Sequence, residues 1–453
     1  MKISESSIYK SFVASNAASR AHAERARTCV PTGTSRALLR HPPFVAYTAR
    51  ANGVHTFDLD GNQRIDFHGN YTALIHGHAH PTITAAVQAQ LPNGSAYSAP
   101  PMQEYALAEH LCARIPAVEQ VVFNNSGSEA VMIALRAARA LTGRNSIAKF
   151  EGAYHGSSDF MMVGGHGLPA LSDPCQLSEP KPDVGGLPLA ATRDVVLVRY
   201  NDPEAVRTAI RTQGDQLAAL IIEPMLGAGG LIPAEPEFLA VVREETARAG
   251  VVLICDEVIT LRQAYGGAQS TYDLEADLTT MAKIIGGGFP IGAVGGKREF
   301  MRCFEDSELG GSVANLGTFS ANPISTCAGL AAMKLLDASA LAALNQLGDY
   351  ARSELSRIIA RHGAAAQITG AGSLFQIHWT RQPLRDTRGV ETANDNFKML
   401  TFLGLANRGI HISVRGMCAL ATPMTRPHVD TLVAAFEDVV LEMAREGWAV
   451  TGE

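Results

Sequence analysis

Short apolar runs recur through the middle of the chain and alternate with alanine-rich segments that favour helices. The runs are VVF (121–123), SIAKF (146–150), VVLVRY (195–200), AALIIEP (218–224) and VVLICDEVI (251–259). Near-continuous apolar runs of this length, separated by helices, are typical of a parallel sheet that is covered on both faces. From about residue 82 onward the pattern therefore predicts an α/β domain.

One helix of this region can be followed residue by residue. After Ser128 the apolar side chains fall at helical spacing and form one stripe. The stripe consists of Val131, Ala134, Leu135, Ala138 and Leu141. Gly143 is placed to end this helix.

The two ends of the chain have different textures. The first 30 or so residues predict a helical arm, and 44–67 alternates β-formers with Asn-Gly and Asp-Gly turns, which indicates short antiparallel strands. After about residue 335, helical and β-like pieces indicate a smaller α+β domain. We therefore expect an N-terminal arm with strands of the small domain (1–81), a large domain (82–335) and a C-terminal small domain (336–453).

Composition narrows the class of protein. Of 453 residues, 46% are hydrophobic and 18% charged, which argues against broad disorder, and the net charge of -6 gives no footprint for nucleic acid or an anionic membrane. No apolar run has spanning length, and the polar N-terminus does not resemble a secretory signal. Seven cysteines without a C-x-x-C pair fit reduced thiols. We expect a cytoplasmic enzyme.

The stretch NNSGSEA (124–130) lies between a predicted strand and a predicted helix. Ser126, Gly127 and Ser128 then occupy the helix N-terminus, where free N–H groups, the helix dipole and two hydroxyls can bind a phosphate. The same residues also fit an ordinary serine N-cap with Glu129 in the first turn.

Two further positions suggest chemistry. Asp256 follows a fully apolar run, so it lies at the carboxyl end of a parallel strand, where ligands bind. A buried carboxylate there needs a cationic partner. The ordinary alternative is an acidic residue that caps the next loop. Lys283 precedes an apolar pair and three glycines in AKIIGGG. A lysine in apolar surroundings loses its proton readily and can form an imine, whereas a solvated lysine before a turn is the ordinary alternative.

Together these three positions identify a resemblance to the class III aminotransferases, which are fold-type I enzymes dependent on pyridoxal 5'-phosphate (PLP). The chain is most similar to the branch that includes glutamate-1-semialdehyde aminomutase. The matching stretches span roughly residues 30–425 in family order and include KFEGAYHGSSD, DEVITLRQAYGGAQ, DLTTMAKIIGGGFPIGAVGG and GTFSANP. The resemblance implies a large, mostly parallel sheet domain flanked by helices, plus a smaller α+β domain.

The resemblance also implies roles for individual residues. Lys283 would carry the cofactor as a Schiff base and move the substrate's α-proton, and Asp256 would pair with the pyridine nitrogen. The remaining cofactor contacts would come from Ser126, Gly127, Ser128, Tyr154, His155, Glu223 and Val258. Gly317 and Thr318 would reach the phosphate of a neighbouring subunit, which implies a homodimer.

Some positions depart from the aminomutase pattern. The late glutamate of aminomutases, which handles a diamino intermediate, has no counterpart in VRGMCAL (414–420), and Asn315 replaces a frequent histidine. These details are similar to D-phenylglycine aminotransferases. They imply transfer of the amino group of a D-aryl-glycine to 2-oxoglutarate, which gives an aryl 2-oxo acid (benzoylformate for D-phenylglycine) and L-glutamate. The alternative is glutamate-1-semialdehyde 2,1-aminomutase or another class III aminotransferase or racemase.

Two residues are candidates for binding the substrate. Arg36 in TGTSRALL resembles the position where this branch places a carboxylate-binding arginine, whose fork suits a carboxylate. Tyr71 replaces the tryptophan of aminomutases and leaves an aromatic wall for an aryl group. A solvated surface arginine is the ordinary alternative for Arg36.

Two other classes of protein compete with this interpretation. His76, His78 and His80 have a spacing that places histidines on one face of a strand, as in a metal-dependent hydrolase, but no carboxylate is placed to complete the set, and we expect no metal. A non-catalytic binding module would have lost Lys283 or Asp256, and both are present.

Overall fold

The chain folds into two compact units, each described here by itself. The computed structural model describes residues 2–165, 167–168, 176–305 and 313–451. The large unit comprises Pro81–Ala342 and Pro383–Glu391, and the small unit comprises Met1–His80, Ala343–Gln382 and Thr392–Glu453. Segment 383–391, which we expected in the C-terminal small domain, thus belongs to the large unit.

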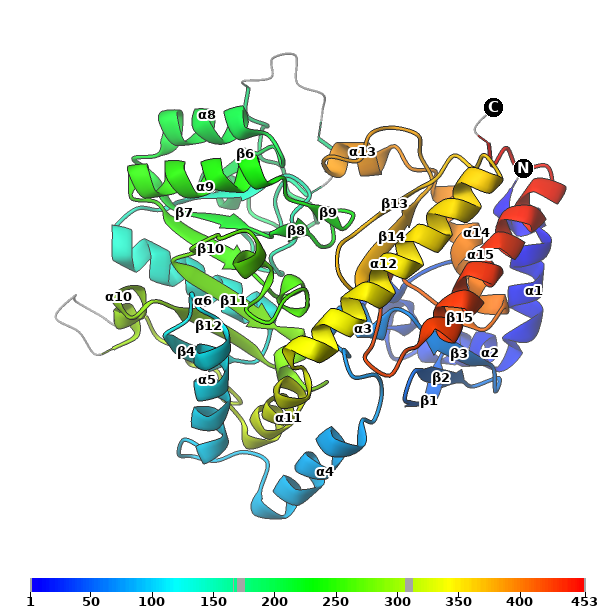
Figure 1. Cartoon of the computed structure of the whole chain (residues 1–453), viewed down its shortest axis with the longest axis horizontal. Coiled ribbons are helices and arrows are strands. Elements are labelled where there is room, and N and C mark those ends of the chain that lie inside the picture. Colours follow the sequence, from blue (N-terminus) through cyan, green and yellow to red (C-terminus); the bar gives the residue numbers. More distant parts are fainter. Residues whose placement is uncertain (1, 166, 169–175, 306–312, 452–453) are drawn as a thin grey trace. The chain divides into compact units, whose positions relative to one another are not determined.

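A seven-stranded sheet forms the centre of the large unit (Figure 1). In spatial order its strands are β4 (Gln120–Asn124), β12 (Gly292–Gly296), β11 (Leu278–Ala282), β10 (Val252–Asp256), β7 (Leu217–Ile222), β5 (Ser146–Phe150) and β6 (Val195–Val198). The central pairs are parallel, as the apolar runs predicted, whereas β12 runs antiparallel to both β11 and β4.

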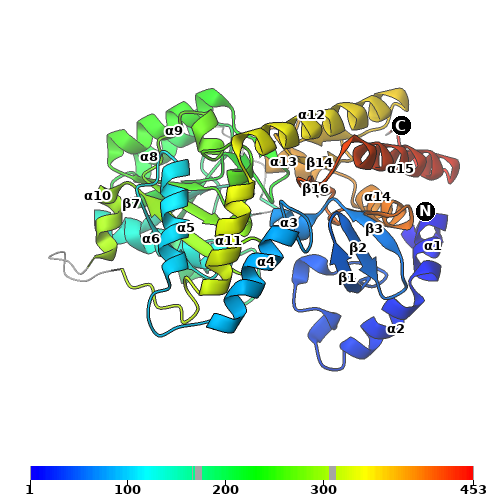
Figure 2. The same ribbon diagram turned by 60° about the horizontal axis from the view of Figure 1, so that its bottom comes forward.

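Helices cover the sheet and the adjoining surface of the large unit. They are α4 (Pro81–Gln90), α5 (Met102–Arg114), α6 (Gly127–Thr142), α7 (Ala190–Arg193), α8 (Pro203–Gln213), α9 (Pro236–Ala249), α10 (Arg298–Met301), α11 (Pro323–Leu335) and α13 (Thr387–Glu391), with a two-stranded ribbon of β8 (Met225–Leu226) and β9 (Ile232–Pro233). Helix α11 packs against both α4 and α5 (Figure 2).

Both faces of this sheet are buried, and alternate residues of one strand enter two different cores. The alternation is clear in β10, where Ile254 packs with helix α6 and Leu253 packs with helices α8 and α9. The same alternation separates Ile221 from Leu220 in β7. A strand buried on both faces has no polar side to alternate with, which explains the continuous apolar runs.

Helix α6 has the apolar stripe that the sequence predicted. Val131, Ala134, Leu135 and Ala138 belong to one buried core, and Leu141 packs against it. The helix ends at Thr142, and Gly143 follows in the left-handed conformation with its N–H bonded to the Arg139 carbonyl.

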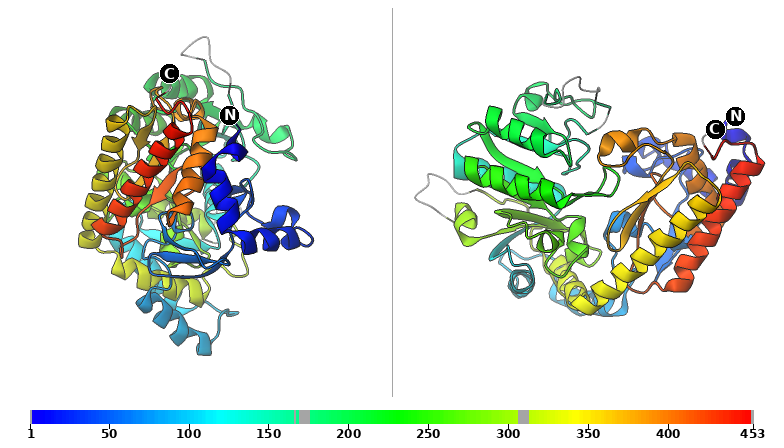
Figure 3. Two further views of the ribbon diagram at one scale, coloured as in Figure 1. Left: turned by 90° about the vertical axis from the view of Figure 1, so that its right-hand side faces the viewer. Right: turned by 45° about the horizontal axis from the view of Figure 1, so that its top comes forward.

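The small unit combines two sheets with long helices. One sheet has the order β1 (Thr48–Asn52), β2 (His55–Asp58), β3 (Gln63–Asp66) and β15 (Ile410–His411), and the other has β13 (Gln367–Thr369), β14 (Leu374–His378) and β16 (Met417–Ala419). The helices are α1 (Ser7–Ser15), α2 (Ala17–Ala26), α3 (Gly69–Thr72), α14 (Asp395–Asn407), α15 (Arg426–Arg445) and most of α12 (Ala338–Arg361). Helix α14 packs against α1 and α15 (Figure 3).

Among the described helices, no single one is long and apolar enough to cross a membrane. Only α11 and α12 taken together, bent by 74° at their break, reach that length and composition.

Candidate active site

A pocket of about 290 Å³ opens at the carboxyl ends of the parallel strands of the large unit. Its walls come from the turns that follow five strands, because the carboxyl ends of parallel strands meet at one edge of a sheet. The lining residues are Asn125, Ser126, Gly127, Ser128, Val131, Tyr154, His155, Gly156, Glu223, Asp256, Val258, Ile259, Ala282, Lys283, Phe289, Pro290 and Ile291. The three positions singled out in the sequence therefore share one cavity.

The N-terminus of α6 forms one wall of the pocket. Ser126 is the N-cap of this helix, and its Oγ accepts a hydrogen bond from the Glu129 amide at 3.2 Å. The amides of Gly127 and Ser128 lie in the first turn, where an α-helix provides no backbone acceptor for them. The ordinary N-cap is thus present, and it still leaves two N–H groups at the pocket for an anion.

Asp256 is the last residue of β10 and is almost fully buried, with 3% of its surface exposed. Its Oδ1 accepts from the Val258 amide at 3.0 Å, and its Oδ2 lies 2.7 Å from Nδ1 of the buried His155. Burial lowers the pKa of His155 although Asp256 opposes this shift. A neutral His155 that donates from Nδ1 would fix the orientation of the Asp256 carboxylate.

Lys283 directly follows β11 and has an unusual backbone for a residue with a side chain. Its φ of 50° lies in the left-handed region, a conformation that costs about 1–3 kcal/mol and is concentrated at functional sites. Burial lowers the pKa of its amine to about 8, with Asp256 and Glu223 opposing. The nearby Gly287 has φ of 58°, and a Cβ there would lie 2.4 Å from the Ala328 carbonyl oxygen of α11. Close packing on this helix explains that glycine.

Glu223 follows β7 and is buried behind the pocket. Its two oxygens accept from the amides of Tyr154 at 3.2 Å and Gly227 at 3.0 Å. Burial, followed by the charge of Asp256, raises the pKa of Glu223 to about 8. Glu223 therefore fixes the backbone of Tyr154 from behind the pocket.

Lys149 is a buried cation that the sequence analysis did not single out. It lies in β5 with 0% of its surface exposed, and its Nζ donates to the carbonyl oxygens of Met161 at 2.8 Å and Val163 at 3.0 Å. Burial lowers its pKa to about 8. A lysine inside the apolar run SIAKF was the signal that could have revealed it, because lysine is almost never fully buried without partners.

Gly317 and Thr318 are exposed and, within the described part of the chain, lie outside the pocket lining. They follow Asn315, whose side chain donates to the Phe123 carbonyl at 2.5 Å. Gly317 also lies against Asn125, which does line the pocket. Their expected contact with a neighbouring subunit stays a prediction.

Arg36 and Tyr71 are neighbours within the small unit. The Arg36 guanidinium lies 5.2 Å from the Tyr71 ring centroid and donates to Oδ1 of Asn70 at 2.6 Å. Burial raises the pKa of the Tyr71 hydroxyl, and the charges of Arg36 and of a second arginine, Arg415, oppose this shift. Arg415 lies in VRGMCAL, the segment that lacks the aminomutase glutamate, and the sequence analysis passed over it.

Two of the three histidines of the hydrolase alternative bind separate partners, and the ring of the third, His80, lies 5.6 Å from that of His76. Nδ1 of His76 lies 2.9 Å from Oγ1 of Thr422, and Nε2 of His78 lies 2.8 Å from Oδ2 of Asp66. The one set of described side chains with donor atoms close enough for a metal is Asp66, His68 and His411. That set does not include His76, His78 or His80.

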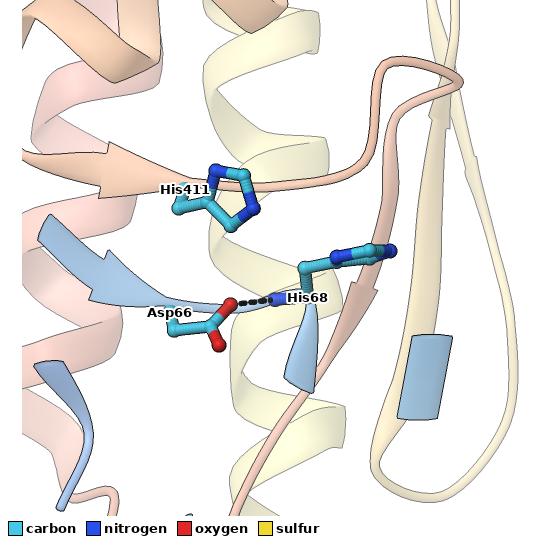
Figure 4. Close-up of side chains that lie close together, drawn as sticks. All are labelled: Asp66, His68 and His411. Atoms are coloured by element: carbon cyan, nitrogen blue, oxygen red, sulfur yellow. Dashed lines mark hydrogen bonds between the residues drawn. The ribbon is translucent and has the colours of Figure 1, made fainter. Parts of the chain in front are cut away.

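The cluster of Asp66, His68 and His411 has the contacts of a structural brace (Figure 4). Oδ1 of Asp66 accepts from the amides of His68 at 2.9 Å and Gly69 at 3.1 Å, and Oδ2 is bound to His78. The His68 ring extends away from this carboxylate. Because both oxygens of Asp66 already accept hydrogen bonds, the carboxylate ties the turn after β3 to the strand.

The residues of the pocket fit PLP. A lysine amine of lowered pKa, a buried carboxylate in contact with a histidine and a helix N-terminus with two available amides suit the aldehyde, the pyridine nitrogen and the phosphate of this cofactor.

Comparison with known proteins identifies the family. The sequence model of the family Aminotransferase class-III matches residues 39–440. The chain therefore belongs to the class III aminotransferases. It is a PLP-dependent enzyme of the transaminase family, and PLP is its cofactor, as in a related transaminase solved with PLP bound.

Three relatives illustrate the range of activities around this chain. Glutamate-1-semialdehyde 2,1-aminomutase of Methanothermobacter thermautotrophicus is 36% identical over 419 residues, which cover 92% of this chain and 97% of the relative. Beta-phenylalanine transaminase of Variovorax paradoxus is 35% identical over 428 residues, 94% of this chain and 93% of the relative. An omega-transaminase from Sphaerobacter thermophilus has a TM-score of 0.90 at 43% identity and covers 94% of this chain and 98% of its own.

Proposed function

We propose that the protein is an aminotransferase in which Lys283 holds PLP and moves the proton of the reaction, with an amino acid and a 2-oxo acid as substrates. The observation that carries this proposal is the meeting of Lys283, Asp256 and the N-terminus of α6 in one pocket. PLP, when bound, withdraws electrons from the carbon that carries the substrate's amino group. The protein then has to bind the group, orient it and move protons.

Lys283 has the properties of a base that works near neutral pH. With a pKa of about 8, about a tenth of the amine is unprotonated at pH 7, against about one part in three thousand for a lysine with the ordinary pKa of 10.5. Only the unprotonated amine can attack the aldehyde carbon of PLP or accept a proton. The left-handed backbone at Lys283 directs this side chain from the end of β11 into the pocket.

The other pocket residues bind and orient the cofactor in this proposal. Asp256 would pair with the ring nitrogen, and Tyr154 and Val258 would contact the ring. The hydroxyls and amides of the α6 N-terminus, at Ser126, Gly127 and Ser128, bind the phosphate. The contacts of His155 with Asp256 and of Glu223 with the Tyr154 amide support these positions.

We also propose that a second copy of the chain completes the phosphate site through Gly317 and Thr318. Leu316 and Phe319 flank these two residues and are 87% and 60% exposed. Phe289, which lines the pocket, is 36% exposed. Large apolar side chains gathered at the surface near a site support burial against another protein.

We propose a cytoplasmic location as well, supported by six free cysteines among the described residues.

For the substrate, the relatives favour the alternative reading over D-phenylglycine itself, because their names give β-phenylalanine and glutamate-1-semialdehyde. We propose an amino donor that carries an aryl group, with D-phenylglycine as one member of the class to test. Arg36 would bind a carboxylate and Tyr71 would contact the aryl group. Arg415 supports 2-oxoglutarate as acceptor. This acid has two carboxylates, and the charges of two arginines, Arg36 and Arg415, act on the Tyr71 hydroxyl.

The aminomutase reaction is the second candidate. Its support is that an aminomutase matches 92% of this chain at 36% identity. Against it stands the missing late glutamate in 414–420. The two reactions differ in a simple respect: a transaminase needs an acceptor oxo acid, whereas the mutase converts glutamate-1-semialdehyde alone.

The test is an assay of the purified PLP-loaded enzyme with single donors. Both enantiomers of phenylglycine and of β-phenylalanine are incubated with 2-oxoglutarate, and the glutamate formed is resolved by chirality. Glutamate-1-semialdehyde is supplied alone in a parallel reaction. Glutamate formed from any aryl donor supports the transaminase proposal. Conversion of the semialdehyde with no turnover of aryl donors would replace it with the aminomutase reaction.

A further inference from the structure

A short excursion of the C-terminal half of the chain belongs to the large unit. Segment Pro383–Glu391, which contains α13, lies in sequence between β14 and α14 of the small unit, yet it is part of the large unit. Close to the two ends of this segment, the hydroxyls of Thr380 and Thr392 form a hydrogen bond of 2.7 Å. The excursion is therefore a closed loop that brings a few side chains to the large unit.

Arg388 is the main contact of this loop. Its Nε donates to Oε2 of Glu151 at 2.8 Å and its Nη2 donates to Oε1 at 3.1 Å, so that the guanidinium binds the carboxylate with two parallel bonds. Nη2 also donates to Oγ of Ser178 at 3.1 Å, and this hydroxyl in turn donates to Glu151. One guanidinium thus joins three segments that are more than 200 residues apart in sequence at their extremes.

The Glu151 carboxylate depends on this contact. Glu151 is 1% exposed, and within the described chain Arg388 is the cation that pairs with it. A buried carboxylate left without its cation is strongly unfavourable, so removing Arg388 would destabilise the position of Glu151. The Glu151 hydrogen bond also raises the pKa of Arg388. The cation of the pair is therefore permanent.

Glu151 lies where β5 passes into the turn that enters the pocket. Tyr154 and His155 follow it by three and four residues and line the pocket. Gly152, which directly follows Glu151, packs closely on segment 383–391. A Cβ at Gly152 would lie 2.3 Å from Cβ of Thr387. A change in the position of Glu151 would therefore move the start of this turn.

We propose that Arg388 is a positioning residue for the cofactor: by holding Glu151 it fixes the turn that places Tyr154 and His155 in the pocket. The inference rests on the proposed roles of these two residues. Two described residues between β5 and α7 also contact this loop: Ser178 shares the guanidinium, and the Gly167 amide donates to Glu391 of α13 at 2.8 Å.

The test compares PLP retention in variants of the holoenzyme. Arg388→Met keeps the length of the side chain and removes its charge, and Arg388→Lys restores the charge with one bond in place of two. We expect Arg388→Met to raise the dissociation constant of PLP about ten- to a hundredfold, by analogy with the loss of affinity when a partner that orients a metal ligand is removed. Arg388→Lys should recover part of this loss.

Arg385 provides a matched control in the same loop. It pairs with Glu235 at the surface, where the two side chains are 65% and 45% exposed, and Arg385→Met should leave PLP retention within about twofold because exposed pairs contribute little. Visible circular dichroism of bound PLP reports the orientation of the ring. A purely structural role of Arg388 would lower the melting temperature and leave both the PLP dissociation constant and this spectrum unchanged.

Each outcome decides the proposal. If Arg388→Met and Arg385→Met retain PLP equally well, Arg388 does not position the cofactor. If Arg388→Met does not fold, Arg388→Lys and Glu151→Gln are measured instead. Both should weaken PLP retention, and unchanged retention in both overturns the proposal. A wild-type enzyme that binds PLP but transfers no amino group would refute the proposed reaction while leaving these PLP measurements valid.

Discussion

Lys283 combines a left-handed backbone with a buried amine, and both features serve one position in the pocket. We predict that Lys283→Ala retains part of its PLP through the phosphate and Asp256 contacts but turns over at least about 100-fold more slowly, because loss of a positioned acid–base group costs about 10²–10⁴-fold. Turnover with the best amino donor measures this effect. Borohydride treatment followed by peptide mass spectrometry should find PLP attached to the Lys283 peptide of the wild type and to no peptide of the variant. Near-normal turnover of Lys283→Ala would end the assignment.

The lowered pKa of the same amine predicts a pH dependence. The reactive form is the unprotonated amine, whose fraction increases as pH rises through the pKa. The rate at which the apoenzyme takes up PLP should therefore increase between about pH 7 and pH 9, with a midpoint near 8. An unperturbed lysine would give a rate still rising at pH 10. Stopped-flow absorbance at a series of pH values measures the midpoint, and a rate that is flat over this range would contradict the role of Lys283.

At the scale of single elements, the strand β5 carries a stability prediction. Lys149→Met leaves the carbonyl oxygens of Met161 and Val163 without their donor, and an unsatisfied buried acceptor costs about 1–3 kcal/mol. We therefore expect the free energy of unfolding to fall by about that amount and amide hydrogen exchange to accelerate at 161–164. Chemical denaturation measures the first quantity.

Lys297→Met is the matched control for this prediction. Lys297 pairs with Glu275 at the surface, where the side chains are 38% and 80% exposed, so its loss should change the free energy of unfolding by less than about 0.5 kcal/mol. Equal effects of the two substitutions would mean that the buried contacts of Lys149 do not stabilise the segment after β5.

The elements that the sequence predicts well are those whose pattern is local. Strands β5, β7 and β10 are continuous apolar runs, and α6 has a complete stripe with a terminal glycine. Strand β12 (GAVGG) has no such run, and its antiparallel pairing with β4 and β11 depends on the surrounding sheet rather than on its own residues. The pattern alone therefore could not identify it.

The residues of the candidate site that the sequence predicts are likewise those that belong to a local pattern. Lys283, Asp256 and the α6 N-terminus end predicted elements, so their place at one sheet edge follows from topology. Arg388 acts through a carboxylate 237 residues away. Such a long-range partner leaves no trace in residue spacing, and only the folded chain reveals it.

At the scale of the whole molecule, the exposed segment around Gly317 leads to a prediction about assembly. Leu316 and Phe319 are 87% and 60% exposed beside a residue that lies against the pocket-lining Asn125. We expect the wild type to sediment at twice the chain mass of 48.0 kDa. The double variant Leu316→Asp/Phe319→Asp should shift toward the monomer, because two charges would have to be desolvated in the interface.

This assembly prediction has a second readout, because a second copy is proposed to supply phosphate contacts through Gly317 and Thr318. The double variant should lose PLP on dilution, and its PLP retention should depend on protein concentration as mass action requires. Leu189→Asp is the control, since Leu189 is also a large exposed apolar residue, at 74%, but lies outside the pocket lining. Analytical ultracentrifugation and PLP absorbance are measured on the same dilution series. A double variant that stays dimeric and retains PLP like Leu189→Asp would show that this segment neither joins two copies nor completes the phosphate site.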